Sequence, residues 1–330
     1  MKPSEVAESI RTCYKLRRPL FVWGPPGVGK SETMAGVAKD LGIGLVDFRM
    51  ALRDPTDVKG FPMPDQKTGT MKFYRDGELP TEGRGFLFMD ELNSSAQATQ
   101  AAGMQLCLPP FKVGDYILPE GWVPMAAGNR EGDRGVVHRM PSPLANRFTH
   151  VDYDVNADDF VRWAQDTDQS AELIAFTRFR PNLLFTFDPK LNDRAFGTPR
   201  SWVAADEIRR EEKNPKVAFE LIKGTVGEGN GTEFWSFINL IDKLPSVDEI
   251  KLNPGTVPIP DQPATQYAVV TTLATHTKDI SGFERFMIYI ERMSKEFQTV
   301  YIRDAMRKDP KIKTAKVFTK WAMKNEKVIM

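Results

Sequence analysis

The stretch GPPGVGKS occupies Gly24 to Ser31, between the apolar run Pro19 to Trp23 and the segment SETMAGVAKDLG. It fits the pattern G-x-x-x-x-G-K-[ST]. The apolar run predicts a buried strand and the following segment predicts a helix, which is the context that this pattern requires. Glycine-rich turns also occur for packing alone, but the lysine and the hydroxyl in register favour a phosphate-binding loop.

Each part of this loop has a physical role in holding phosphate. Its glycines permit positive φ values and a close approach of backbone to phosphate, and N–H groups at the helix start present partial positive charge. Lys30 is expected to reach the β- and γ-phosphates, and the Ser31 hydroxyl to ligate Mg²⁺. We assign ATP binding to the loop and the residue after it: Gly24, Pro25, Pro26, Gly27, Val28, Gly29, Lys30, Ser31 and Glu32.

Length and composition are ordinary for a cytoplasmic globular protein of about two domains. The chain has 330 residues, a net charge of +1 and only two cysteines, Cys13 and Cys107. Two cysteines do not make a disulfide framework, so we expect both to be reduced and buried. No segment approaches the ~18 apolar residues of a membrane span, and the first residues lack the apolar centre of a signal peptide. We therefore expect a cytoplasmic protein with no membrane partner.

The order of patterns along the chain predicts two domains. Short apolar runs alternate with helical patterns in the first half, as in a parallel α/β sheet, and the pattern is helical from Ala157 onward. We predict an α/β domain over 1–152 and a helical domain over 153–330, with a proline-rich connection near 242–265 and a flexible loop at Gly224 to Gly231. The expected strands are Leu20–Trp23, Gly44–Phe48, Gly85–Met89, Trp122–Ala127 and His150–Tyr153.

A second constellation, GFLFMDELN, spans Gly85 to Asn93. Its apolar run predicts a buried strand, and Asp90 and Glu91 follow at the carboxyl end, where ligands lie in open α/β sheets. Successive strand residues point to opposite faces, so the two carboxylates are expected to have different roles. Asp90 is predicted to hold Mg²⁺ through its water shell, and Glu91 to orient and polarise the water that attacks the γ-phosphate.

A third feature, AAGN, ends the strand at Trp122–Ala127 and closes on Asn129. An amide at the end of a strand beside the metal-binding strand can hydrogen-bond the attacking water or the γ-phosphate. An asparagine that merely closes a turn is the alternative. Because Asn129 follows the other two motifs in this order, we assign it to catalysis.

Taken together, these motifs resemble the AAA+ ATPases, and within them the MoxR-like branch of the helix-2-insert clade. The resemblance rests on GPPGVGKS (Walker A), FLFMDELN (Walker B), VPMAAGN, PSPLANRF and GTPRSW, and covers Pro19 to about Ile208. It implies a P-loop AAA+ core, a parallel sheet flanked by helices, followed by an all-helical lid. Segments near 58–82 and 110–119 look like the inserted hairpins of this branch, which line or crown the pore in related rings.

The resemblance also assigns two arginines. Arg147, in ANRF, matches the arginine finger that reaches the neighbouring subunit's ATP, although Arg139 is a rival and an ion pair of Arg147 with Asp152 or Asp154 is a structural alternative. Arg200, in GTPR, matches the second sensor, acting on its own subunit's nucleotide or on a neighbour's.

The sequence thus predicts Mg²⁺-dependent ATP hydrolysis by a ring homo-oligomer, a hexamer, that drives remodelling or chaperone-like assembly of a protein partner. MoxR-like proteins commonly act on partners with von Willebrand factor A domains, so the resemblance implies a separate client of that kind. The alternative is a DNA-dependent motor or a subunit of a nucleic-acid-processing complex, and a third possibility is a nucleotide-gated scaffold. Residues 292 to 330 carry net charge +7 against −6 in the rest of the chain, which is compatible with nucleic acid or with a solvated helix face.

Overall fold

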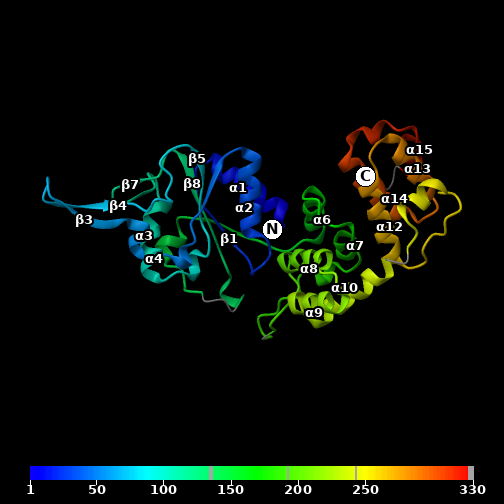
Figure 1. Cartoon of the computed structure of the whole chain (residues 1–330). Helices are drawn as coiled ribbons and strands as arrows, with labels where there is room; N and C mark the ends of the chain where they lie inside the picture. The colour runs from blue at the N-terminus through cyan, green and yellow to red at the C-terminus, as the bar shows by residue number, and fades with distance from the viewer. Residues whose placement is uncertain (134–136, 192, 242–243, 326–330) are drawn as a thin grey trace. The chain divides into compact units, whose positions relative to one another are not determined.

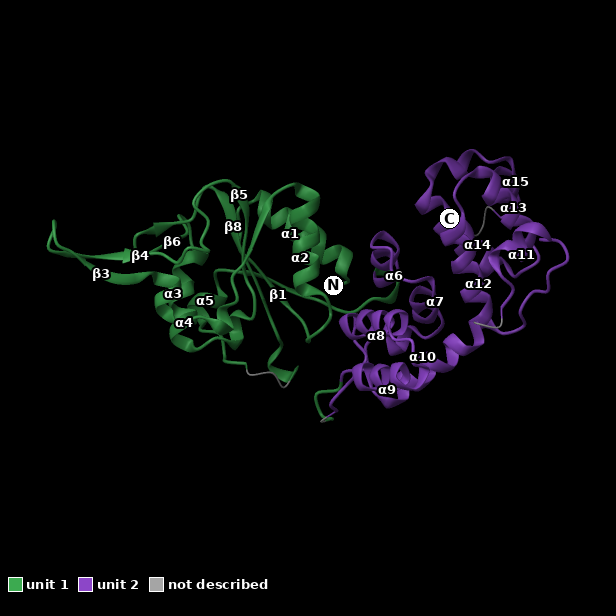
Figure 2. Ribbon diagram, viewed as in Figure 1, with its two compact units in different colours: residues 1–159, 188–192 green, residues 160–187, 193–330 purple. Residues whose placement is uncertain are grey.

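The computed structural model describes residues 1–133, 137–191, 193–241 and 244–325. The chain forms two compact units (Figure 2). Unit 1 comprises Met1–Asp159 with Asp188–Asn192, and unit 2 comprises Phe160–Phe187 with Asp193–Met330. The helix α6 (Ala157–Asp166) carries the chain from the first unit into the second. Residues 242–243 of the predicted proline-rich connection and residues 326–330 of the basic tail lie outside the described residues.

Unit 1 is built on a five-stranded parallel sheet with the strand order β2-β5-β8-β1-β9 (Figure 1). Each strand of this sheet begins and ends within one residue of its predicted bounds. Parallel strands are covered on both faces, which is why β5 and β8 are nearly continuous runs of buried apolar residues. The strands are β1 (Leu20–Trp23), β2 (Gly44–Asp47), β5 (Arg84–Met89), β8 (Gly121–Gly128) and β9 (Thr149–Asp152).

The register of the sheet brings the carboxyl ends of its central strands together. Trp23 of β1 pairs with Gly128 of β8, and Met89 of β5 pairs with Ala126 of β8. The residues that follow β1, β5 and β8 therefore emerge at one edge of the sheet. We call these places, where the chain leaves the end of a strand, the strand exits. Apart from the arginines, all the site residues that the sequence predicts for unit 1 follow these three exits.

Helices cover both faces of the sheet (Figure 1). On one side lie α1 (Pro3–Lys15) and α2 (Lys30–Leu41), and on the other side lie α3 (Pro55–Lys59) and α4 (Gln97–Gly103). The short helix α5 (Ser142–Ala145) precedes β9. The predicted fold class, a parallel α/β sheet flanked by helices and followed by an all-helical part, is confirmed.

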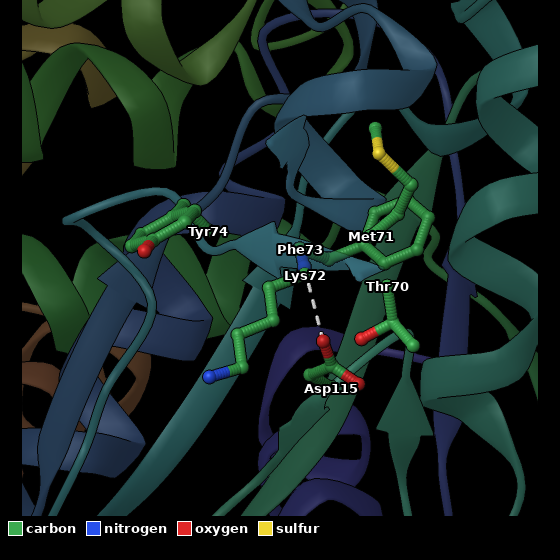
Figure 3. Close-up of a pocket in the computed structure, with 6 residues that line it drawn as sticks. All are labelled: Thr70, Met71, Lys72, Phe73, Tyr74 and Asp115. Atoms are coloured by element: carbon green, nitrogen blue, oxygen red, sulfur yellow. Dashed lines mark hydrogen bonds between the residues drawn. The ribbon is translucent and has the colours of Figure 1, made fainter. Parts of the chain in front are cut away.

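Two antiparallel hairpins leave this core. The longer hairpin pairs β3 (Phe61–Asp65) with β4 (Thr70–Tyr74) and projects from the body of unit 1 (Figure 1), and the shorter hairpin pairs β6 (Lys112–Val113) with β7 (Tyr116–Ile117). The Phe73 main-chain N–H donates to Asp115 Oδ2 at 3.0 Å, so a side chain of the second hairpin joins the first (Figure 3). The long hairpin exposes the large apolar side chains of Phe61, Met63, Met71, Phe73 and Tyr74.

The regular secondary structure of unit 2, over its described residues, consists of helices. One aromatic cluster packs Phe176, Trp202, Phe234 and Phe237, and a second core lies between residues 250 and 321. Its helices are α7 (Ala171–Phe179), α8 (Pro199–Glu211), α9 (Pro215–Val226), α10 (Glu228–Ile241), α11 (Val247–Leu252), α12 (Pro263–His276), α13 (Ile280–Ile290), α14 (Lys295–Lys308) and α15 (Lys316–Lys324).

A buried ion pair ties together three helices of unit 2. Arg178 on α7 and Asp304 on α14 are 8% and 4% exposed and approach to 2.6 Å, and Arg178 also donates to Thr271 on α12 at 2.9 Å. Removing one member of such a pair leaves the other charge buried without compensation, so the pair fixes how these helices pack.

One expectation about unit 2 was wrong. The stretch Gly224 to Gly231 is no flexible loop, because α9 ends at Val226 and α10 begins at Glu228, with the single residue Gly227 between them. Gly227 has φ of +94°, a conformation open to glycine, so one residue suffices for the turn. The proline-rich stretch contains a helix, α11, which begins after Ser246, whose hydroxyl accepts from the Glu249 N–H at 3.2 Å.

Over the part of the chain that the structure describes, helices are too short or too polar to cross a membrane.

The strands of the sheet approach so closely at Gly85 that a side chain at this position is not tolerated. A Cβ on Gly85 would lie 2.3 Å from the Gly44 carbonyl oxygen and 2.7 Å from the Trp122 ring. We expect Gly85→Ala to lower the free energy of unfolding by about 2–3 kcal/mol, measured by urea unfolding. Gly36→Ala is the matched control, because Gly36 lies within α2 with open space around it, and should raise stability by about 0.5–1 kcal/mol. Equal unfolding midpoints for the two variants would contradict this packing.

Candidate functional site

The loop after β1 folds as an anion cradle. Gly27 and Gly29 have φ of +74° and +102°, and Gly29 is the residue from which α2 starts. These left-handed conformations turn the chain sharply, so that main-chain N–H groups at the start of α2 face the interior of the loop. Tyr153, the residue after β9, braces this turn, because its hydroxyl lies 2.9 Å from the Thr33 hydroxyl. Burial raises the pKa of Tyr153 to about 12, so this brace is neutral.

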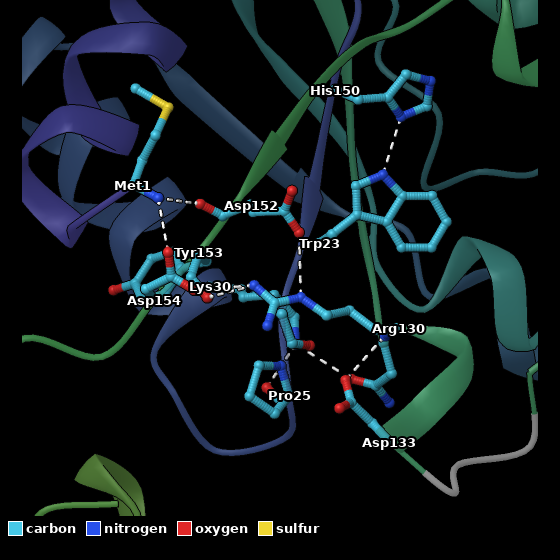
Figure 4. A network of polar contacts seen from close by, with 12 residues as sticks. Met1, Trp23, Pro25, Lys30, Arg130, Asp133, His150, Asp152, Tyr153 and Asp154 are labelled. Carbon is cyan, nitrogen blue, oxygen red and sulfur yellow. Dashed lines mark hydrogen bonds and ion pairs between the residues drawn. The ribbon is translucent and has the colours of Figure 1, made fainter.

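The Lys30 ammonium lies over the loop (Figure 4). Its Nζ donates to the carbonyl oxygens of Gly24 and Pro25 at 2.6 Å and 2.9 Å. It also donates to Asn129 Oδ1 at 3.1 Å, which joins the exit of β1 to the exit of β8. A positive point charge is thus held where the phosphates of a nucleotide in this cradle would lie.

The structure also brings together the exits of β1 and β5. Ser31 Oγ donates to Asp90 Oδ2 at 2.7 Å, and Asp90 is only 8% exposed. A hydroxyl and a carboxylate oxygen side by side fit Mg²⁺, which takes one or two carboxylates from an NTPase and completes its shell with water and phosphate oxygens. Ser31 and Asp90 are therefore the residues that would hold the ion.

Glu91 follows Asp90 in a strained conformation. Its φ of +54° is left-handed, which costs a residue with a side chain about 1–2 kcal/mol. Its main-chain N–H donates to Asp90 Oδ1 at 2.9 Å, so the buried Asp90 carboxylate holds the turn. The Glu91 side chain is exposed and thus accessible to a water molecule, whereas Asp90 is buried. Backbone strain of this kind is typical of functional sites.

Asn129 is held from two sides. Its side chain accepts from Lys30, and its main-chain carbonyl oxygen accepts from Asn93 Nδ2 at 2.7 Å. Next to it, the Gly128 carbonyl oxygen accepts from the Gly24 N–H at 3.2 Å. The loop after β1, the turn after β5 and the end of β8 form one hydrogen-bonded group.

Arg147, the arginine assigned as the finger, makes its hydrogen bond to a residue outside this group. Arg147 is half-buried, and its Nη1 donates to the main-chain oxygen of Met104. Its structural alternative does not form, because Asp152 and Asp154 pair with Arg130 instead, at 3.1 Å and 3.0 Å (Figure 4). Arg139 is exposed in the same unit.

Arg200 belongs to unit 2, where it is exposed in the first turn of α8. The start of this helix is capped, since the Thr198 hydroxyl accepts from the Ser201 N–H at 3.0 Å.

Three residues near the site carried no assignment from the sequence. The hydrogen bond to Asp47 raises the pKa of Arg49, and the carboxylates of Asp90 and Glu91 raise it further, so Arg49 belongs to the charge environment of the site. Tyr153 braces the loop, and Asn93 holds Asn129. Of these three residues, only Asn93 could have been found from the sequence, because it lies within the DELN motif.

No family model matches the chain. Among solved structures, the chain is similar to the RuvB Holliday junction branch migration motor of Thermotoga maritima, with 17% identity, coverage of 76% of this chain and 73% of that chain, and a TM-score of 0.39. It is also similar to a putative ATPase from Cytophaga hutchinsonii, with 13% identity, coverage of 90% and 79%, and a TM-score of 0.37. At such identities and TM-scores the likeness says nothing of activity or substrate, which are argued from the residues of this chain.

Proposed function

We propose that this chain is a Mg²⁺-dependent AAA+ ATPase of the MoxR-like branch that works as a ring, a hexamer, and uses ATP hydrolysis to remodel or assemble a protein partner. One observation carries the proposal. The Ser31 hydroxyl and the Asp90 carboxylate lie 2.7 Å apart, and the Lys30 ammonium lies 3.1 Å from the Asn129 amide oxygen. Three separate sequence motifs thereby meet at one edge of the sheet, in the arrangement that phosphoryl transfer from ATP requires.

The chain's residues divide the chemistry between them. The cradle at 24–29 binds the phosphates through main-chain N–H groups, and Lys30 neutralises their charge. Mg²⁺, held by Ser31 and Asp90, would neutralise charge that develops on the phosphate oxygens. Glu91, exposed beside the buried Asp90, orients the attacking water and accepts its proton, while Asn129 hydrogen-bonds the water or the γ-phosphate.

A neighbouring subunit completes the site in this proposal. Arg147 acts as the arginine finger and Arg200 as the second sensor. To act as a finger, the Arg147 side chain must break its hydrogen bond to the Met104 carbonyl oxygen and bind the phosphate of the neighbouring subunit's ATP. Such a finger is worth about 10³–10⁵ in rate. Oligomerisation therefore controls catalysis.

The client in this proposal is a protein, with a separate von Willebrand factor A domain protein as the leading type. The exposed apolar side chains of the β3–β4 hairpin support a protein contact, because an apolar group of this size on a projecting hairpin is otherwise costly to leave in water. Figure 3 shows the hollow on this hairpin, lined by Thr70, Met71, Lys72, Phe73, Tyr74 and Asp115.

Mixed assemblies of two inactive variants test whether the site is shared. Glu91→Gln should bind ATP but not turn it over, and Arg147→Ala should lose about 10³-fold or more in kcat. In an equimolar mixture, about a quarter of the interfaces of a randomly mixed ring combine an intact Glu91 with an intact Arg147, so a similar fraction of wild-type ATPase activity should return.

Co-purification of a tag carried by one variant shows that mixed rings form. With mixed rings present, no recovery of activity rules out Arg147 as a finger in trans. The same mixture with Arg139→Ala in place of Arg147→Ala tests the rival arginine.

A specific observation supports the second candidate function, a DNA-dependent motor. Lys316, Lys320 and Lys324 are all exposed and recur at intervals of four residues, so they line one face of α15. Like charges at this spacing destabilise a helix slightly, and such a row suits a polyanion. Exposed Lys311 and Lys313 precede it in the 3₁₀ turn η6 (Pro310–Thr314).

Measuring the ATPase rate with and without duplex DNA, at salt concentrations from about 50 to 200 mM, separates the two functions. The protein-remodelling proposal predicts no stimulation by DNA. Stimulation that weakens steeply with salt, and that is lost in a variant with Lys316, Lys320 and Lys324 changed to Gln, would replace it by the DNA motor. Changing Lys39, Lys213 and Lys216 to Gln is the matched control, because these lysines are exposed elsewhere.

A further inference from the structure

The Asn93 side chain is a buried polar group in the turn after β5. Asn93 is 0% exposed and lies in the short 3₁₀ helix η2 (Leu92–Ser94), three residues after Asp90. Its Nδ2 donates to the Asn129 carbonyl oxygen at 2.7 Å. Its own main-chain oxygen accepts from the His138 N–H at 2.7 Å, which fixes the backbone from which the side chain extends.

The other half of the amide is not satisfied. Asn93 Oδ1 is fully buried and has no hydrogen-bond partner among the described residues. A buried oxygen without a donor is unfavourable, because it has given up the hydrogen bonds that water made to it in the unfolded chain. Turning the amide over would bring this oxygen against the Asn129 carbonyl oxygen, so the observed orientation is the one that the Asn129 carbonyl requires.

The surrounding backbone is shaped to admit this side chain. A Cβ on Gly128 would lie 1.9 Å from Asn93 Oδ1, so only glycine at position 128 leaves room for it. Gly128 itself is tied to Gly24 at the start of the phosphate loop. An apolar side chain of the same shape would fill the space without the unsatisfied oxygen, so packing alone does not explain an asparagine here.

We propose that Asn93 is a positioning residue for the ATPase reaction. By holding the main chain of Asn129, it sets the Asn129 amide against Lys30 and so against the reacting γ-phosphate. The inference rests on the proposed function, which supplies the reaction. Asn93 has no direct contact with the nucleotide in this account, and it acts on the rate of the chemical step through Asn129.

The test compares two isosteric variants of Asn93 with a matched control. Asn93→Leu removes the donor to Asn129, and Asn93→Asp places a carboxylate against the Asn129 carbonyl. Gln100 is the control site, since it is also 0% exposed, donates from Nε2 to Ser95 at 3.0 Å, and has an unpartnered Oε1, yet its amide bonds Ser95 and not Asn129. Steady-state ATPase kinetics, binding of MgADP and thermal unfolding are measured for Asn93→Leu, Asn93→Asp, Gln100→Leu and Gln100→Glu.

We expect Asn93→Leu to lower kcat by about 10- to 100-fold, with KM and the MgADP dissociation constant within about threefold of wild type. Its Tm should stay within about 3 °C of wild type, because losing the unsatisfied oxygen offsets losing one hydrogen bond. Asn93→Asp should lower kcat further, through repulsion between the two oxygens. Both Gln100 variants should keep the wild-type kcat, whatever their Tm.

Two results would overturn the inference. One is a kcat for Asn93→Leu equal to that of Gln100→Leu, and the other is a loss of MgADP affinity as large as the loss of kcat, which would make Asn93 a structural support of the loop. If Asn93→Leu fails to fold, Asn93→Ser is used in its place. The serine hydroxyl is too short to reach the Asn129 carbonyl oxygen, so we expect the same loss of kcat. Wild-type protein without ATPase activity would instead sink the proposed function, so the two failures are distinguishable.

Discussion

The hydrogen bond between Ser31 and Asp90 depends on the register of the parallel sheet, and the rest of the site depends on that hydrogen bond. Because β1, β5 and β8 run in the same direction and their carboxyl ends lie at one edge of the sheet, a hydroxyl that follows one strand meets a carboxylate that follows another at 2.7 Å. In the proposed site these two oxygens, one of them almost fully buried, would hold a divalent cation with a nucleotide beside it. A slip of one strand would separate them.

Around this contact the three strand exits share their polar groups. Lys30 donates to the Asn129 side chain, Asn93 donates to the Asn129 main-chain oxygen, and the Gly24 N–H donates to the Gly128 carbonyl oxygen. A structural change at one strand exit therefore alters hydrogen bonds at the others. The strained turn at Glu91 adds a second constraint, because the buried carboxylate before it accepts the Glu91 N–H. In the proposed ring motor, such a group would couple bound nucleotide to the backbone around it.

Much of this arrangement could be predicted from the sequence because the informative residues follow buried strands. Apolar runs locate the strands, Asp90 and Asn129 come directly after two of them, and Lys30 and Ser31 follow the glycine-rich loop after the first. The contacts of Asn93, Arg49 and Tyr153 join elements far apart in the chain, and no local pattern encodes such contacts. The glycine-rich composition of residues 224–231 indicated a loop. Composition does not reveal that one left-handed glycine is enough to join two helices.

The central claim is that a single chain holds only part of an ATPase site and that a neighbour completes it. The most direct test is the ATPase rate per subunit over a range of protein concentrations, with the oligomeric state measured by mass photometry in the same samples. The account predicts a rate near zero where the protein is monomeric, a steep rise as rings form and a plateau once assembly is complete. A rate per subunit that stays constant while rings dissociate into monomers would contradict it.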